Sequence, residues 1–268
     1  MTDTLYQGFP NPRGGSGVLP VACDVLRWPC LRRLGVAMLL IVGMLALTSV
    51  ATATGQTAST APADSVSKPK TIGIVLFPGF ETLDVFGPVE MWARLPDYQI
   101  VMVSQHGGPI KSAQGIDTLT TYSFDTAPQF DIVMIPGGMG TRTEVNNPVM
   151  LAFLRKQDKG TQWTTSVCTG SALLAKAGIL DGRKATSNKI AFTWASSQSN
   201  KVAWQGHARW VIDGKYITSS GVSAGTDMAL GLVEKLYGRE MADRTARGSE
   251  YVWNDDPAKD PFAVETRP

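Results

Sequence analysis

The stretch WTTSVCTGSALLAKA, residues 163–177, carries the strongest signal for the fold of this chain. Residues 163–167 are rich in β-branched and apolar side chains and predict a strand, while residues 169–177 are good helix formers. Only Cys168 separates the two, and small residues stand two positions before and after it. A strand that turns directly into a helix brings these two positions together, so only small side chains fit there. The stretch therefore predicts a strand–helix elbow with Cys168 at its apex.

The place of Cys168 favours a nucleophile. The elbow would project the thiol over the carboxyl edge of a parallel sheet, where doubly wound folds bind ligands. The helix N-terminus offers unpaired N–H groups and the positive end of the helix dipole, which stabilise a thiolate and can lower a cysteine pKa to roughly 3.5–7.5. The alternative is a structural cysteine, because free cysteine is among the most buried residue types.

Strands and helices alternate along the rest of the chain. Continuous apolar runs predict buried strands, and apolar residues at helical spacing predict helices. The expected strands are residues 71–77, 98–104, 130–135 and 163–167, and the expected helices are residues 83–94, 147–159, 169–177 and 224–237. This order predicts an α/β fold, a flavodoxin-like, doubly wound and mostly parallel sheet with helices on both faces.

Two hairpins and a tail complete the expected fold. Residues 107–121 begin with a glycine-rich turn and continue as a short polar hairpin. Residues 209–212 and 215–218 flank the Asp-Gly pair at 213–214, which predicts a type I′ hairpin. Residues 255–268 are polar, contain three prolines and are expected to pack only loosely.

The N-terminal part of the chain resembles a targeting segment. Residues 34–50 form an uncharged apolar run, preceded by two arginines and followed by Ala51-Thr52-Ala53. This order predicts a secretory signal cleaved after Ala53, and hence an exported, periplasmic protein. The alternative is a membrane anchor at residues 34–50, because the run nearly reaches the ~20 residues that a spanning helix needs. We accordingly expect four parts, which are a leader (1–53), a flexible linker (54–70), an α/β domain (71–250) and a C-terminal tail (251–268).

Charge and cysteine usage restrict the possible partners. The formal net charge of +2 comes wholly from residues 1–53, so the remainder is neutral overall and nothing favours a nucleic-acid partner. Two of the three cysteines lie in the leader, so cleavage leaves Cys168 as the only thiol, without an internal disulfide. No cluster of Cys, His and carboxylates has metal-ligand spacing, and we expect no metal.

The sequence IPGGMG at residues 135–140 is a second candidate element. It leaves a strand that is expected to neighbour the one before Cys168. Exposed N–H groups of Gly137 and Gly138 would then form an oxyanion hole or substrate-binding site with the N–H of Thr169. The alternative is a tight connection that needs glycine torsions.

Several short motifs follow one another along the chain. They are FPG at 77–79, LDVFGP at 83–88, IPGG at 135–138, SVCTG at 166–170, LDGRKAT at 180–186 and TSSGVSAGTDMA at 218–229. Together they resemble the ThiJ/PfpI superfamily, which has a class I glutamine amidotransferase-like fold. The likeness covers residues 71–238 and strengthens the interpretation of Cys168 as a nucleophile.

The resemblance implies a partner for the cysteine. Protease-like and glyoxalase-like members place a histidine directly after the cysteine, where this chain has Thr169. The LDVFGP element and the Cys-Thr pair are similar to the isonitrile hydratase-like branch, in which an aspartate near the cysteine takes part in catalysis. Carried over to this chain, that aspartate is Asp84. The alternative role for Asp84 is a helix N-cap.

The two histidines are weaker candidates than Asp84 for a catalytic partner of Cys168. His106 and His207 are the only candidates for a Cys–His pair, and each is more often a surface or packing residue. Some relatives carry a histidine where this chain has Asn188, which cannot act as a general base.

The resemblance implies a cysteine-dependent hydro-lyase that hydrates an isonitrile to an N-substituted formamide through a Cys168 thioimidate, without a cofactor. Cys168 and Asp84 are expected to share one proton, because two like charges raise each other's pKa. Proximity in sequence suggests Phe86, Met139 and Trp92 as pocket residues.

Two rival functions remain open. One is a non-enzymatic thiol redox sensor or stress protein, in which Asp84 stabilises an oxidised Cys168 sulfinate. The other is a glyoxalase or deglycase that acts on 2-oxoaldehydes, which Thr169 disfavours. In each case we expect a small-molecule ligand and no nucleic acid, with a membrane contact only if the leader is retained. Family members are often dimers, so the resemblance also implies a homodimer.

Overall fold

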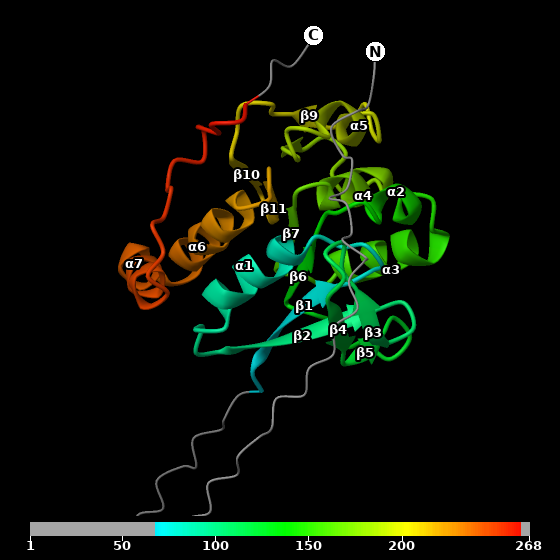
Figure 1. The fold of residues 1–268 in the computed structure, drawn as a ribbon, viewed down its shortest axis with the longest axis horizontal. Helices are drawn as coiled ribbons and strands as arrows, with labels where there is room; N and C mark the ends of the chain where they lie inside the picture. The colour runs from blue at the N-terminus through cyan, green and yellow to red at the C-terminus, as the bar shows by residue number, and fades with distance from the viewer. Residues whose placement is uncertain (1–67, 264–268) are drawn as a thin grey trace, which may run out of the picture. The chain divides into compact units, whose positions relative to one another are not determined.

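A computed structural model describes residues 68–263, and its centre is a seven-stranded sheet with the order β10-β11-β7-β6-β1-β2-β5 (Figure 1). The strands are β1 (Lys70–Val75), β2 (Tyr98–Ser104), β5 (Tyr122–Ser123), β6 (Ile132–Ile135), β7 (Trp163–Val167), β10 (Trp210–Asp213) and β11 (Tyr216–Ser219). All neighbouring strands pair in parallel except β10, which runs antiparallel to β11. The expected mostly parallel sheet is confirmed.

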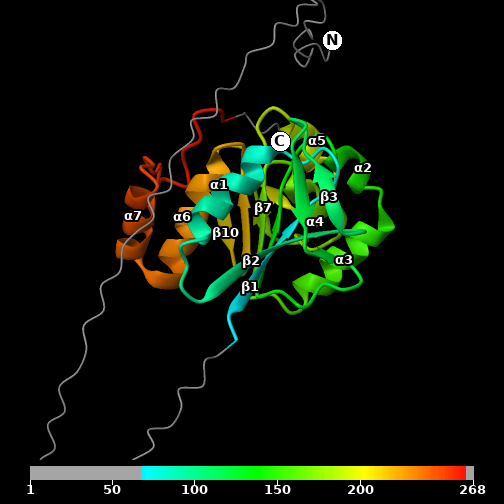
Figure 2. The ribbon, with the colours of Figure 1, turned by 60° about the horizontal axis from the view of Figure 1, so that its bottom comes forward.

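Helices cover both faces of this sheet (Figure 2). One face carries α1 (Thr82–Trp92), α6 (Ala224–Tyr237) and α7 (Arg239–Gly248), and the other carries α2 (Thr141–Glu144), α3 (Pro148–Asp158), α4 (Gly170–Lys176) and α5 (Phe192–Ser196). α6 lies between α1 and α7, while α4 contacts α2, α3 and α5. The doubly wound architecture is therefore confirmed, and the long elements begin and end within two residues of the expected bounds.

The central strands are buried from both sides, which explains their continuous apolar runs. Every residue of β6 is buried, as is every residue of β1 except Lys70. Gly73 interrupts the apolar run of β1 for a steric reason. A Cβ at this position would lie 2.2 Å from the ring of Phe130, so the aromatic ring fills the place of a side chain.

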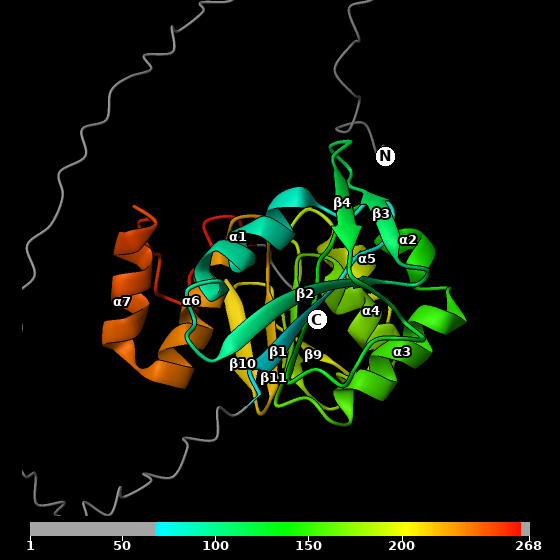
Figure 3. The same ribbon diagram turned by 90° about the horizontal axis from the view of Figure 1, so that it is seen from below.

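Both predicted hairpins exist, but one has a different turn. β3 (Gly108–Lys111) and β4 (Asp117–Thr120) form the polar hairpin, which projects beside β2 (Figure 3). In the β10–β11 hairpin, Asp213 pairs with Tyr216, so the two loop residues are Gly214 and Lys215. The type I′ prediction is wrong, because that turn needs a positive φ at both loop residues and only Gly214 has one, at 63°. A third, short pair joins β8 (Lys184–Ala185) to β9 (Ala203–Trp204).

Most of the described part of the C-terminal tail, residues 255–263, is exposed, as the expected loose packing implies, but two contacts attach it to the domain. Within its described part, the carbonyl of Pro257 accepts a 2.8 Å hydrogen bond from the Arg209 amide. Asp260 is buried and accepts a hydrogen bond from the Ser220 hydroxyl. The composition of the tail did not indicate these two contacts, which satisfy polar groups of the domain.

The leader, its cleavage site and most of the expected linker lie outside the described residues, as does the apolar run at 34–50. Among residues 68–263, no helix is both long and apolar enough to cross a membrane.

Candidate active site

Cys168 occupies the apex between β7 and α4 with a φ of 56°, so the strand–helix elbow is confirmed. The need for a small residue two positions later is steric, since a Cβ on Gly170 would lie 2.2 Å from the carbonyl oxygen of Ile135. The hydroxyls of Ser171 and Ser187 each donate a 3.1 Å hydrogen bond to the Cys168 carbonyl. These contacts hold the cysteine backbone in a conformation that non-glycine residues rarely adopt.

Two glycines form the walls beside the cysteine. A Cβ on Gly137 would lie 2.7 Å from Cys168 Cβ, and a Cβ on Gly221 would lie 2.5 Å from the same atom. Gly221 also has a φ of 72°, which disfavours any other residue. Gly221 belongs to a motif noted in the sequence, but nothing local indicated that it touches the cysteine.

Asp84 lies in the first turn of α1 and is completely buried. Its Oδ2 accepts a 2.8 Å hydrogen bond from the Gly137 amide, whereas Oδ1 is buried without a hydrogen-bond partner in the described structure. The N-cap of α1 is Glu81, so the alternative role of Asp84 as an N-cap is wrong. Burial raises the pKa of Asp84 well above 3.8, the Gly137 hydrogen bond opposes this, and the charge of Glu81 adds to it.

The Cys168 thiol interacts with this carboxyl. Cys168 is only 6% exposed, and burial raises its pKa well above the ordinary value. The negative charge of Asp84 raises the pKa further, while the N–H and hydroxyl of Thr169 lower it. The predicted lowering of the thiol pKa is therefore wrong in direction, because lost solvation outweighs the helix N-terminus. The raised pKa values of Asp84 and Cys168 mean that the pair retains a proton.

Thr169 is the polar centre of the site. Its hydroxyl accepts hydrogen bonds of 3.1 Å from the Gly138 amide and from the Thr141 hydroxyl. The amides of Gly137 and Gly138 thus already have acceptors within the protein, namely Asp84 and Thr169. The predicted oxyanion-binding role of the two amides stays a prediction. It would require an oxyanion to replace Asp84 and Thr169 as the acceptors of these amides. The Thr169 amide, by contrast, acts on the sulfur itself.

Arg142 is a component that the sequence analysis missed. Its guanidinium carbon lies 4.1 Å from the ring centroid of Trp194, and Nη1 donates 3.2 Å to the Thr141 hydroxyl. Within residues 68–263 this half-buried arginine has no ion-pair partner. Burial lowers the Arg142 pKa, and the charge of Cys168 raises it. Arg142 is therefore a positive charge that acts on the site, and no sequence motif marked it.

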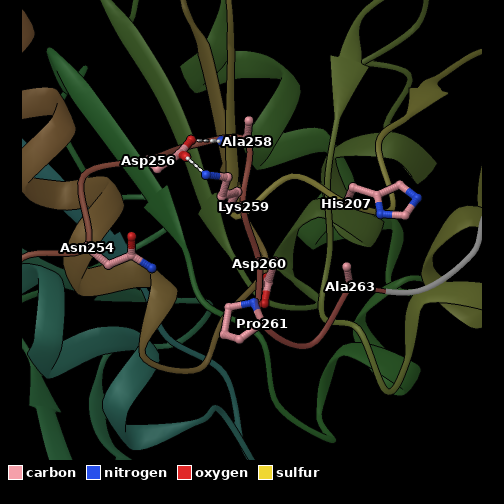
Figure 4. A pocket seen from close by; sticks show the side chains of 8 residues that line it. All are labelled: His207, Asn254, Asp256, Ala258, Lys259, Asp260, Pro261 and Ala263. Carbon is pink, nitrogen blue, oxygen red and sulfur yellow. Dashed lines mark hydrogen bonds and ion pairs between the residues drawn. The ribbon is translucent and has the colours of Figure 1, made fainter.

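The remaining candidates lie elsewhere. His106 and His207 are both exposed, and neither is among the groups that shift the Cys168 pKa. Figure 4 shows His207 in an open pocket with residues of the C-terminal tail. Asn188 accepts a 2.9 Å hydrogen bond from the Ala191 amide, which is a local structural role.

Of the three expected pocket residues, two are exposed and one is buried. Phe86 and Met139 are exposed. Trp92 is wrong as a pocket residue, because it is fully buried and donates a 3.1 Å hydrogen bond from Nε1 to the Ala229 carbonyl in α6.

A pocket of about 590 Å³ adjoins the cysteine through Gly221. It is lined by Leu83, Asn188, Lys189, Ile190, Gly221, Val222, Ser223, Phe262 and Ala263. Neither Cys168 nor Asp84 is itself among these lining residues, so Gly221 is the link between the pocket wall and the cysteine. No group of three or more His, Cys, Asp or Glu residues in the described part of the chain is arranged to hold a metal ion.

The fold and the site together define a class, which is a flavodoxin-like α/β domain with a cysteine at a strand–helix elbow and a buried carboxyl beside it. The DJ-1/PfpI family model matches residues 70–235, and the chain belongs to this family.

Individual relatives agree with this assignment. The chain is 35% identical over 183 residues to isonitrile hydratase of Pseudomonas putida, covering 68% of this chain and 78% of that protein. It is similar to the crystal structure of a ThiJ/PfpI family protein from Pseudomonas syringae, with a TM-score of 0.62 and 31% identity over 68% of this chain and 75% of that one. Protein dj-1beta of Drosophila melanogaster is 25% identical over 185 residues, which are 68% of this chain and 97% of that protein.

Proposed function

We propose that the protein is a cysteine-dependent lyase that hydrates an isonitrile to an N-substituted formamide. The observation that carries this proposal is the buried Asp84–Cys168 pair, whose raised pKa values retain a proton next to the sulfur. The similarity to isonitrile hydratase supports the choice of substrate class.

In the first step the sulfur attacks the isonitrile carbon. That carbon accepts a soft nucleophile, and the addition forms a C–S bond and leaves an electron pair on the same carbon. The proton shared by Cys168 and Asp84 is transferred to this pair, which gives the thioimidate Cys168–S–CH=N–R. Asp84 acts as the general acid, and the burial that raises its pKa favours the protonated form that this role needs.

In the second step water resolves the thioimidate. Water adds its oxygen to the carbon and delivers one hydrogen to nitrogen, which gives a tetrahedral intermediate. The C–S bond then breaks, the formamide R–NH–CHO leaves, and the second hydrogen of water returns to the Cys168–Asp84 pair. One isonitrile and one water thus yield one formamide.

Thr169 and Arg142 support the sulfur during both steps. The N–H and hydroxyl of Thr169 stabilise negative charge on the sulfur. The Thr169 hydroxyl accepts the Gly138 amide and donates a long, 3.4 Å hydrogen bond to the Gly138 carbonyl, which it would exchange for the sulfur. The guanidinium of Arg142 adds a positive charge at the end of the Thr141–Thr169 hydrogen-bond chain.

The direct test is isonitrile turnover by the purified full-length chain and by Cys168→Ala and Asp84→Asn. We expect the formamide to accumulate with the unmodified protein, to be absent with Cys168→Ala and to be reduced at least about 100-fold with Asp84→Asn. Absence of formamide at high concentrations of correctly folded protein would refute the proposal.

A thiol sensor is the second candidate, and the unpartnered Oδ1 of Asp84 is the observation that favours it. A protonated carboxyl at this position would donate a hydrogen bond to a Cys168 sulfinate. Under mild peroxide, two oxygens added at Cys168 without isonitrile turnover would select this function. Lactate formed from methylglyoxal would instead select the glyoxalase.

We further propose that the protein acts on its small-molecule ligand as an exported homodimer. The apolar run before Ala53 supports export, and membership of the family supports the dimer. A mass of one chain in solution by light scattering would argue against the dimer.

A further inference from the structure

The C-terminal segment lies outside the residues that match the family model, which end at residue 235. Two buried carboxylates nevertheless attach it to the domain. The first is Asp227 in α6, which pairs with the buried Arg209. Oδ1 of Asp227 accepts hydrogen bonds from the Asn254 amide at 3.0 Å and from the Tyr251 hydroxyl at 3.1 Å. The start of the segment is therefore fixed to the domain core.

The second carboxylate belongs to the segment itself. Asp260 is buried, accepts from the Ser220 hydroxyl and lies 3.9 Å from the ammonium of Lys189. Its backbone amide donates 3.1 Å to the His207 carbonyl, and its Oδ1 accepts 2.9 Å from the Phe262 amide. These contacts determine where Phe262 stands.

Phe262 stands at the pocket next to the cysteine. Its side chain is 68% exposed, and Ile190 on the same pocket is 91% exposed. Gly221, which contacts Cys168, is a further part of the lining. A pocket of about 590 Å³ falls in the range of small-molecule sites, which is roughly 300–1,000 Å³. The exposed apolar side chains therefore surround a space that matches a small ligand.

Lys189 does not make this pocket polar. Its side chain is 4% exposed, and its ammonium donates 2.8 Å to the Thr186 hydroxyl and 2.7 Å to the Ala208 carbonyl. The lysine thus contributes its aliphatic stem to the lining. Leu83, Ile190, Val222 and Phe262 leave the pocket mainly apolar.

We propose that residues 251–263 complete the ligand pocket of this protein, and that Phe262 selects ligands whose substituent is apolar and larger than a methyl group. As a statement about isonitriles, this rests on the proposed function. The selectivity itself belongs to the pocket, so it is measurable with any electrophile that reaches Cys168.

The test compares two alkylating reagents that share one reactive group, iodoacetamide and N-benzyl iodoacetamide. Rates are measured on the full-length chain by mass spectrometry of the peptide that contains Cys168, because Cys23 and Cys30 also carry thiols. The quantity compared is the rate of the benzyl reagent divided by the rate of iodoacetamide. We expect this ratio to be higher at Cys168 than with free cysteine. In Phe262→Ala this preference should fall about three- to tenfold, and Phe262→Leu should retain most of it.

Val252→Ala is the matched control. Val252 lies in the same segment and is 91% exposed, but it does not line the pocket, so its removal should leave the preference unchanged. Since Phe262 is also exposed, its variants are expected to fold, which thermal unfolding will verify.

An unchanged preference in Phe262→Ala would overturn the inference. A shift of Phe262→Ala from dimer to monomer with unchanged preference would also overturn it and assign this surface to a subunit interface. A protein that fails to hydrate isonitriles but shows the Phe262-dependent preference would refute the proposed function and support the pocket.

Discussion

Oδ2 of Asp84 accepts a 2.8 Å hydrogen bond from the amide of Gly137, a residue 53 positions later in the chain. This contact ties the first turn of α1 to the loop that follows β6. It orients one carboxyl oxygen and leaves the other, Oδ1, buried without a hydrogen-bond partner in the described structure. The site therefore contains a carboxyl whose pKa burial raises, and the charge of that carboxyl raises the pKa of the Cys168 thiol in turn.

Replacing Asp84 by Asn should remove a pH dependence of stability. Because the pKa of Asp84 in the folded protein is raised above 3.8, the folded state binds a proton more tightly than the unfolded state does. The resulting stabilisation of the fold is fully present below pH 3.8 and is lost as the pH rises through the folded pKa. The stability of the unmodified protein relative to Asp84→Asn should thus fall as the pH rises above 3.8, by about 1.4 kcal/mol for each unit of pKa difference. Urea unfolding across this pH range measures it. A difference that stays constant with pH would contradict the raised pKa.

Thr169→Val should weaken both the site and the fold. The variant leaves the Gly138 amide without its acceptor, while the Thr141 hydroxyl keeps the Gly138 carbonyl at 2.7 Å. It also removes the hydroxyl that lowers the pKa of Cys168. We expect a loss of about 1–3 kcal/mol in the free energy of unfolding. Alkylation of Cys168 should also require a higher pH. Thr169→Ser, which keeps the hydroxyl, should restore most of both properties, and a Ser variant as defective as Val would show that the methyl group matters instead.

Arg142→Met should slow Cys168 alkylation at neutral pH by about three- to tenfold, because a positive charge near the sulfur is lost. Arg142→Lys keeps the charge and should restore most of the rate.

Arg183→Met is the control for Arg142. Arg183 also lies over an aromatic ring, that of Tyr216 at 5.3 Å, but its charge is paired with Asp213 at 3.6 Å. An equal effect on Cys168 from both methionine variants would refute a specific role of Arg142. The pH profile of alkylation separates this charge effect from a general loss of structure.

Gly221→Ala should be more harmful than Gly182→Ala. Both glycines have a left-handed backbone, with φ values of 72° and 73°, so each variant incurs backbone strain of about 1–2 kcal/mol. A Cβ on Gly182 meets nothing within 4 Å, whereas one on Gly221 lies 2.5 Å from Cys168 Cβ. We expect Gly221→Ala to lower the free energy of unfolding by about a further 1–3 kcal/mol and to change the reactivity of Cys168. Equal midpoints of urea unfolding would contradict the close contact.

Export predicts a mature N-terminus at Thr54. Edman sequencing of protein recovered from the periplasm should begin Thr-Gly-Gln-Thr, since cleavage after Ala53 follows the small-residue pattern. Recovery of the uncleaved chain from the membrane fraction would select the anchor at residues 34–50 instead.

Local patterns were sufficient for most of the fold. The strands and helices follow from apolar periodicity and from glycine and proline, which act over a few residues. The elbow at Cys168 was predictable from the small residues at positions 166 and 170, although the group that excludes a side chain at Gly170 is the carbonyl of Ile135 on the neighbouring strand. The turn at Gly214–Lys215 was not, because the register of β10 and β11 sets the loop length.

Asp84 was found through a family resemblance, and its contact with Gly137 needed the fold. Arg142, Trp194 and Gly221 carry no motif that points to the cysteine, and the C-terminal tail looked loosely packed by composition. Each acquires its role from contacts between distant parts of the chain.

The direction of the Cys168 pKa shift is the clearest case of a property that only the tertiary structure decides. A helix N-terminus is visible in the local sequence and favours a thiolate, whereas desolvation depends on every element that covers the thiol. Burial is a property of the whole packed domain, so only the tertiary structure could decide that the thiol and its carboxyl partner keep a proton.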